Sequence, residues 1–459
     1  MINKIIDFSI NNKFIIGLLT LTIIGAGIWS MTKVPIDAVP DITNNQVQVI
    51  TQSPNLGTED IEQIVTYPVE VAMSNLPNVE EIRSISRFGL SVVTIVFDDD
   101  MGTYLPRQLV AEKLNEVKEQ IPAGFGEPTM GPISTGLGEI YQYTLKVKLE
   151  YQDKYSISDV RTMQDWIVQR QMAMVPGVVE VNAIGGKIKQ YEVAVDPNEL
   201  KSIGITISDV FEALEANNEN TGGAYIEKNH QANFIRGEGL VRSLDDIKKI
   251  TVKTINNVPI TIGDIATVQF GSAIRYGALT QDGEGEVVGG LVMMLKGANS
   301  NDVIANVKER MVEIQKSLPE GVVIEPLLDR SKLIGETTST VATNLIEGAL
   351  IVIFVLIFLL GNWRGGLIVA STIPLSLLFA FILMNVFNVW ANLMSLGAID
   401  FGIIVDGAVI IVESTVFLIA SQVLKKKKIT AKKRDEVAAS ASKKMMNAAF
   451  FGQLIILIV

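Results

Sequence analysis

The stretch NLMSLGAIDFGIIVDGAVIIVES (residues 392–414) decides the fold, because it places three carboxylates in an otherwise apolar run. These are Asp400, Asp406 and Glu413. A run of this length and composition is typical of a helix that crosses a bilayer. At the centre of such a helix an ionised side chain costs roughly 2.5–3.5 kcal/mol, so it is tolerated where it faces a protein or water-filled interior. The stretch therefore predicts a membrane helix in an ion-coupled machine.

The spacing of the acids places two of them on one stripe of this helix. Asp406 and Glu413 are seven residues apart, which at about 100° per residue brings them almost into line, and Asp400 lies roughly 120° from Asp406. Such carboxylates can take up and release protons or bind a cation. They can also form a static ion pair, but the five predicted spans contain no Lys or Arg. A proton pathway is therefore favoured over a static ion pair.

The composition excludes several other classes of protein. The chain has 459 residues, a formal net charge of −11, no Cys and one His. Without Cys there is no disulfide scaffold, thiolate metal site or thiol nucleophile, and a net negative chain is a poor nucleic-acid binder. His230 lies in the polar segment KNHQANF and is expected to be solvated. An enzyme is disfavoured, because no nucleophile–base pair or phosphate-binding G-x-x-x-x-G-K spacing is present.

Further apolar runs predict four more membrane spans, at residues 14–31, 345–360, 367–387 and 445–459. The first run has a secretory signal peptide as its alternative. No A-x-A-like cleavage site follows it, and the Pro-punctuated VPIDAVPDIT comes next, so a spanning helix is favoured. The last run begins a fifth span in which the sequence stops.

Basic residues predict the direction of insertion. They precede the first span (Lys4 and Lys13), separate the second from the third (Arg364), and crowd residues 425–434 after the fourth. Placing all of them in the cytoplasm gives a consistent topology. Residues 33–341 are then expected on the outer side of the membrane, in a protein that crosses it several times.

The outer region predicts a repeated α+β unit. NLPNVEEIRSISRFG (residues 75–89) and MVPGVVEVNAIGG (174–186) both read as a helix end, a Pro, a strand and a Gly turn. In each copy a further strand is expected to end at an Asp, in VVTIVFDD (92–99) and YEVAVDP (191–197). The period predicts two βαβ-type sandwiches. Residues 200–270 differ and predict a separate inserted lobe.

Several long motifs resemble one known family. They include VPIDAVPDIT, SPNLGTEDIEQIVTYPVE, DRSKLI, GNWRGGLIVASTIPLSLL and NVWANLMSLGAIDFGIIVDGAVIIVE. Together they resemble the resistance-nodulation-division superfamily and, within it, heavy-metal efflux pumps of the cobalt-zinc-cadmium type, along essentially the whole chain. The resemblance implies a homotrimeric inner-membrane pump that uses proton entry to export divalent cations, namely zinc, cobalt, cadmium and, as a further option, nickel. It also implies a periplasmic membrane-fusion adaptor, an outer-membrane channel, and no cofactor beyond the transported cations and protons.

The resemblance implies the N-terminal half of such a transporter, a membrane α-helical bundle plus an α+β periplasmic region with ferredoxin-like porter subdomains and part of a docking domain. The expected boundaries are a cytoplasmic N-terminus at 1–13, spans at 14–33, 341–360, 367–387 and 393–420, a first porter subdomain at 34–134, a second at 135–340 with the docking lobe at about 200–270, a basic cytoplasmic connection at 421–444, and the start of a fifth span at 445–459.

Residue by residue, Asp400, Asp406 and Glu413 match the acidic proton-relay positions of the family's fourth span. The IDFG form, with Asp400 present, resembles the divalent-cation branch. Glu139, in GLGEIYQYT, matches a position where zinc-exporting relatives place an acid near the substrate pathway, and an oxygen ligand suits borderline divalent ions. A solvated loop acid is the alternative for Glu139.

The sequence departs from the family at two points. Ser414 stands where the family usually has Asn, and the chain is less than half the family's length, so the basic partner of the acids is expected in the absent half. Two alternatives stay open. The cargo can be copper, silver or drugs, or the chain can be a truncated, non-transporting membrane-anchored binding or assembly protein.

Overall fold

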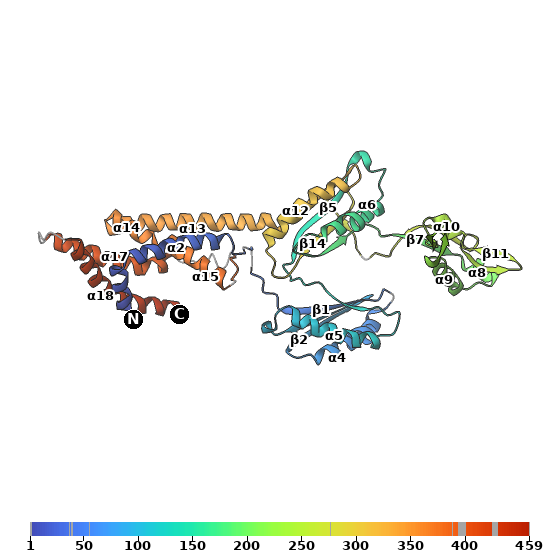
Figure 1. Ribbon diagram of the computed structural model, residues 1–459, viewed down its shortest axis with the longest axis horizontal. Helices are drawn as coiled ribbons and strands as arrows, with labels where there is room; N and C mark the ends of the chain where they lie inside the picture. Colours follow the sequence, from blue (N-terminus) through green and yellow to red (C-terminus); the bar gives the residue numbers. More distant parts are fainter. Residues whose placement is uncertain are drawn as a thin grey trace. The chain divides into compact units, whose positions relative to one another are not determined.

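The computed structural model describes residues 2–35, 37, 40–54, 56–275, 277–387, 389–392, 401–424 and 430–458. The chain divides into two compact units (Figure 1). Unit 1 comprises Met1–Ile140, Met293–Asn306 and Asp329–Val459, and unit 2 comprises Tyr141–Val292 and Val307–Leu328. Unit 1 therefore contains the apolar helices at both ends of the chain and the α/β segment that follows the first of them.

Apolar composition produces long helices at the two ends of the chain. They are α1 (Ile2–Asn11), α2 (Lys13–Met31), α13 (Arg330–Leu360), α14 (Trp363–Ala370), α15 (Thr372–Val386), α17 (Phe401–Leu424) and α18 (Ala431–Ile458). Among the described residues, four helical stretches are long and apolar enough to cross a bilayer: Lys13–Met31, Arg330–Val355, Trp363–Val386 and Ile404–Ser421. The chain is thus a membrane protein, and the fifth span stays a prediction.

The helices differ from the expected spans and connections at three places. Helix α13 begins at Arg330, before the predicted span, because the Asp329 side chain caps its N-terminus by accepting from the Ser331 N–H. The third span breaks between α14 and α15 at Ser371, three residues before Pro374, whose missing N–H cannot complete the helical ladder. Residues 431–444, expected as a connection, are helical and form the first half of α18.

Small residues allow these helices to pack closely. A Cβ added at Gly27 of α2 would lie 2.5 Å from the Cβ of Leu378 on α15, and one at Gly407 of α17 would lie 3.2 Å from Nε2 of Gln453 on α18. Helices that lack Cβ atoms at the contact can approach each other this way in a membrane. Gly407 therefore allows the acidic helix α17 to approach α18 closely.

The first α/β subdomain is an antiparallel sheet covered by helices. Its strands run in the order β2 (Val79–Arg87), β3 (Leu90–Phe97), β1 (Asn45–Gln52) and β4 (Pro128–Met130). Alternate residues of β1 are buried, so Val47 and Val49 face the core. The helices α4 (Tyr67–Ser74) and α5 (Tyr104–Gln120) supply the other half of that core.

The second subdomain repeats this design. Its sheet contains β5 (Glu139–Val147), β6 (Val178–Ile184), β13 (Leu279–Thr280), β14 (Glu286–Met294) and β15 (Val322–Asp329), with helices α6 (Ile157–Met163), α7 (Gln169–Met172) and α12 (Ser300–Ser317). Each subdomain has a π-helical turn just before its shorter helix, Ile61–Thr66 in the first and Gln164–Val168 in the second. Each turn buries one polar side chain, Thr66 or Gln164, which is hydrogen-bonded inside the subdomain. This shared irregularity supports the predicted repeat.

The predicted repeat is wrong for one strand of the second copy. Strand β7 (Lys189–Val195), expected as the counterpart of β3, pairs with β12 (Ala266–Ser272) in a separate two-stranded sheet, and β14 takes the counterpart's place beside β6. The turn at Gly185 and Gly186, both at positive φ, directs the chain out of the subdomain after β6. Length and alternation alone do not show which partner a strand finds.

The inserted lobe therefore begins at β7, earlier than expected. It also contains α8 (Pro197–Ile203), α9 (Ile207–Ala216), β8 (Thr221–Lys228), β9 (Gln231–Gly237), α10 (Leu244–Lys248), β10 (Thr251–Ile255), β11 (Val258–Thr261) and α11 (Ile262–Ile265). Its own core includes Leu200, Ile247 and Ile262. His230 is exposed at positive φ in the turn between β8 and β9, in keeping with its expected solvation.

A buried ion pair joins three distant segments of unit 1. The carboxylate of Asp37, just after α2, lies 2.9 Å from the guanidinium of Arg330 at the start of α13. Ser300, the first residue of α12, donates to the same carboxylate over 2.9 Å, and Arg330 also donates to the Leu137 carbonyl. Asp37 is 5% exposed, Arg330 9% and Ser300 1%. These groups fix where α2 and α13 meet the start of α12 and the approach to β5.

Substituting Arg330→Met should strongly destabilise the protein, because Asp37 would keep a buried charge without its cation. Breaking a buried pair in this way costs about 3–5 kcal/mol. We expect a lower unfolding midpoint in detergent by thermal denaturation, whereas Arg87→Met, at an exposed position, should change it little. The double substitution Asp37→Leu with Arg330→Met should recover most of the loss, and a double variant as unstable as the single one would contradict the pairing.

Candidate functional site

The acidic helix α17 has one packed face. Val405, Val409 and Val412 contact side chains of α13, α14 and α15, among them Val352 and Ile373. Another side of α17, at Gly407, lies against α18. Helical geometry therefore fixes the rotation of α17 within unit 1.

Asp406 and Glu413 lie on a stripe between these two packed sides. At about 100° per residue both fall roughly 80–100° from the valine face, and both are exposed in this chain. Neither forms an ion pair with another of the described residues. Asp400 lies outside the described residues. Asp406 and Glu413 thus lie on one exposed side of α17, and their role in a proton relay stays a prediction.

Contact between two exposed carboxylates and lipid is energetically unfavourable. A carboxylate facing hydrocarbon is costly unless it is neutralised, hydrated or covered by protein. The stripe that carries Asp406 and Glu413 therefore needs either further protein or a water-filled path beside it.

Glu139 is the first residue of β5 and is exposed. Its backbone position is fixed on both sides, because the neighbouring Gly138 donates to the Thr135 carbonyl and accepts from the Met294 N–H over 2.7 Å. The side chain thus projects from a rigid strand end. The structure does not bring Glu139 together with Asp406 or Glu413, which lie on a membrane helix.

A small polar cavity lies close to Glu139 in the chain. Its volume is about 150 Å³, and it is lined by Gln46, Gln48, Pro132, Ser134, Thr135, Gly136 and Met293. Four of these side chains offer amide or hydroxyl oxygens, which are neutral ligands for hard and borderline cations. Glu139 itself is not among the lining residues. Sequence reasoning missed this cavity, and the alternating burial of β1, which leaves Gln46 and Gln48 on the open face, is the signal that indicates it.

Asp41 lies near the same segment and is held as a carboxylate. Partial burial raises its pKa, but hydrogen bonds from Thr43 and Thr135 and the charge of Lys296 outweigh this, so that the pKa is lowered from 3.8. The Gly136 N–H donates to the Thr43 hydroxyl over 3.2 Å. Asp41 is therefore a fixed negative charge beside the segment that contains Ser134 and Thr135.

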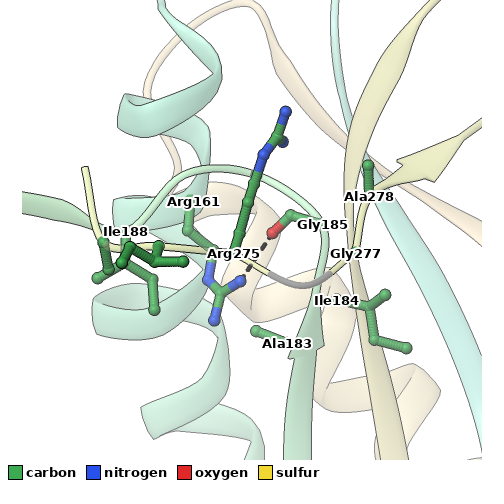
Figure 2. A pocket seen from close by; sticks show the side chains of 11 residues that line it. Arg161, Ala183, Ile184, Gly185, Ile188, Arg275, Gly277 and Ala278 are labelled. Carbon is green, nitrogen blue, oxygen red and sulfur yellow. Dashed lines mark hydrogen bonds between the residues drawn. The ribbon is translucent and has the colours of Figure 1, made fainter. Parts of the chain in front are cut away.

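A second cavity, of about 320 Å³, lies in unit 2 where the two connections to the lobe meet (Figure 2). Arg161 donates through Nε to Asp165 over 2.9 Å and through Nη1 to the Gly185 carbonyl over 2.7 Å. Arg275 pairs with Glu286, which also accepts from the Gly186 N–H. Both guanidinium groups thus already bind acceptors of this chain. We interpret the cavity as a structural junction rather than an anion site.

No group of three or more His, Cys, Asp or Glu side chains suitable for a metal ion occurs in the part of the chain that the structure describes. A tightly held structural metal therefore has no candidate site among these residues. The arrangement instead offers separate features, a pair of membrane acids and an oxygen-lined cavity near an exposed Glu.

The comparisons with known proteins identify the family of the chain. The AcrB/AcrD/AcrF family matches residues 5–459. The chain is 47% identical to the cobalt-zinc-cadmium resistance protein CzcA of Cupriavidus metallidurans, over 91% of this chain and 39% of the relative. It is 40% identical to the nickel and cobalt resistance protein CnrA of the same organism, over 90% of this chain and 41% of the relative. The cation efflux system protein CusA of Escherichia coli is 37% identical.

Solved structures give the same result. The crystal structure of a heavy metal efflux pump superposes with a TM-score of 0.83 and 33% identity, covering 98% of this chain and 47% of that chain. The fold class and the resemblance predicted from the sequence are thus confirmed. The chain spans less than half of the length of these relatives.

Substituting Asp41→Asn should remove a pH-dependent stabilisation. Because the pKa of Asp41 is lowered in the folded state, its carboxylate stabilises the fold above about pH 4, and this contribution is lost as the pH falls through the folded pKa. The effect is below about 1 kcal/mol, since the group is largely solvated. Unfolding midpoints measured against pH should differ at neutral pH and converge in acid. A difference that does not vary with pH would contradict this assignment, and Asp153→Asn, at an exposed position, is the control.

Proposed function

The chain belongs to the AcrB/AcrD/AcrF family, and from this premise we propose that it is the N-terminal part of a pump that exports divalent heavy-metal cations in exchange for protons. The observation that carries the proposal is the pair Asp406 and Glu413 on one uncovered stripe of a membrane helix. The 47% identity to a cobalt-zinc-cadmium resistance protein supports divalent cations as the cargo. Family membership also supports a transporter rather than an enzyme.

In this proposal, Asp400, Asp406 and Glu413 form the proton relay. Proton uptake neutralises the acidic stripe and removes the cost of moving it toward an apolar surface. Helix α17 then shifts against α13, with which it shares the contact around Val352 and Val412. Because α13 is one helix from Arg330 to Leu360, the shift reaches Asp37 and Ser300 at the base of the periplasmic region.

The cargo path is proposed to pass Glu139. Its carboxylate supplies charge at the end of β5, and the nearby cavity supplies the neutral oxygens of Gln46, Gln48, Ser134 and Thr135. Such weak, mixed oxygen ligation suits a cation that must be released again. The metal is substrate here, and no resident cofactor is part of the proposal.

The assembly is proposed to be a homotrimer in the inner membrane, with several spans, a periplasmic adaptor and an outer-membrane channel. The four candidate membrane helices and the family support a membrane pump. The basic residues 425–434 support a cytoplasmic position for the connection after α17.

Export of copper or silver is a second candidate, and one observation favours it. Met293 lines the oxygen-rich cavity, and a thioether suits soft monovalent ions. The cavity has one thioether and four oxygen-bearing side chains. It therefore supports export of copper or silver less than export of divalent cations.

Substituting Asp406→Asn in the pump that contains this chain should abolish metal resistance, because the amide cannot take up a proton and release it. Growth in zinc, cobalt and cadmium measures the loss, and cross-linking should show unchanged assembly. Glu436→Gln, an exposed acid on α18, should leave resistance intact and is the matched control. Normal resistance with Asn at position 406 would refute the relay.

Substituting Glu139→Gln should weaken metal binding by about tenfold or more, as the loss of a group in a metal site commonly does. Titration of the purified protein with zinc measures the affinity, and growth across zinc, cobalt, cadmium, copper and silver measures selectivity. Glu150→Gln is the control, since Glu150 is another exposed acid of the periplasmic region. A selective loss of copper or silver resistance would favour the second candidate, and an unchanged affinity would make Glu139 a solvated acid.

A further inference from the structure

The first half of α18 carries an exposed basic surface. Lys432, Lys433, Arg434 and Lys444 are exposed, and none has a carboxylate partner among the described residues. Residues eleven apart on a helix are nearly in line, so Lys433 and Lys444 share a stripe about three turns long. Together with exposed Lys4 of α1, these residues are here named the basic platform.

Two ion pairs join this part of α18 to α1 and to the first residue of α2. Lys13 lies 2.5 Å from Asp435, and Lys443 lies 2.5 Å from Asp7. The pairs engage Asp7 of α1 and Asp435 of α18, and Glu436 is an exposed acid on this part of α18. The platform therefore keeps a clear excess of positive charge.

Helix α1 also exposes apolar side chains beside the platform. Ile5 is 60% exposed and Phe8 is 49% exposed. Only Asn12 separates α1 from α2, a candidate membrane span, so α1 lies at the edge of the bilayer. Ten residues of helix are about 15 Å long, too short to cross the bilayer. Such a helix lies in the interface, with its apolar side chains toward the acyl chains.

We propose that the basic platform binds the phosphate groups of anionic phospholipids in the leaflet that receives Ile5 and Phe8. Clusters of Lys and Arg next to a membrane helix attract anionic lipid in this way. A free phosphate ion has the same chemistry as the lipid headgroup, but it offers no acyl chain to the exposed apolar side chains. The proposal rests on the insertion of the chain in a bilayer with α1 and the start of α18 on one side, and not on the nature of the cargo.

The test compares lipid affinities of the full chain in detergent. Phosphatidylglycerol and phosphatidylcholine are titrated separately, and bound lipid is counted by native mass spectrometry. The unaltered chain should prefer phosphatidylglycerol. Replacing Lys432, Lys433, Arg434 and Lys444 with Gln should remove the preference, by about fivefold for each cation that contacts a headgroup. Replacing the three lysines with Arg, with Arg434 unchanged, should preserve the preference for phosphatidylglycerol.

A matched control removes the same number of charges from the lobe. Lys201, Lys228, Lys249 and Lys253 are exposed there, and their replacement with Gln should leave the preference intact. An equal loss in this control, or no preference in the unaltered chain, would overturn the proposal. Displacement of phosphatidylglycerol by excess inorganic phosphate would also overturn it, by assigning the site to a free ion.

The lipid preference is read separately from transport. The Asp406→Asn chain should keep the full preference for phosphatidylglycerol, because Asp406 lies outside the platform. If the efflux assay fails while this preference is intact, the result concerns the proposed pump and not lipid binding. If the platform variant loses the preference, the result concerns lipid binding alone. Circular dichroism of the platform variant should match that of the unaltered chain, which separates lost binding from lost folding.

Discussion

The ion pair between Asp37 and Arg330 is the constraint on which the arrangement of unit 1 depends. Two buried charges are tolerated only when each satisfies the other, together with neighbouring hydrogen-bond partners. Here those partners are Ser300 and the Leu137 carbonyl. The exit of the first span, the start of α13, the start of α12 and the approach to β5 must therefore meet at one point. Moving any of these segments would leave a buried charge or hydroxyl unpaired.

This meeting point lies at the start of α13, the helix that joins the membrane bundle to the α/β part of unit 1. Helix α13 continues unbroken from Arg330 into the apolar bundle, where it packs against the valine face of α17. A helix transmits displacement because its backbone hydrogen bonds resist bending. The acids of α17 lie beside that face, so a change in their charge alters the surface next to the contact. The coupling proposed above therefore does not require Glu139 to approach the membrane acids.

Sequence periodicity predicted the local elements well and the long-range pairings poorly. The alternation of Val47 to Gln52 and the apolar spans depend on neighbours within one element, and the structure contains these elements. Strand β7 alternates like β3, yet it pairs in the lobe, because the partner of a strand is set by contacts far along the chain. The pair of Asp37 and Arg330 had no local signal for the same reason. Both residues stand in polar, Pro- or Gly-flanked segments that look like ordinary connections.

The candidate site shows the same division. The stripe formed by Asp406 and Glu413 follows from helical geometry alone, so spacing was sufficient to predict it. The cavity beside β1 required the meeting of Gln46, Thr135 and Met293, which are far apart in the sequence. What the stripe lacks is equally informative. Two acids on an apolar helix, beside two packed sides and facing neither, define a surface that lipid cannot cover cheaply. A further helix or a hydrated channel must therefore complete it.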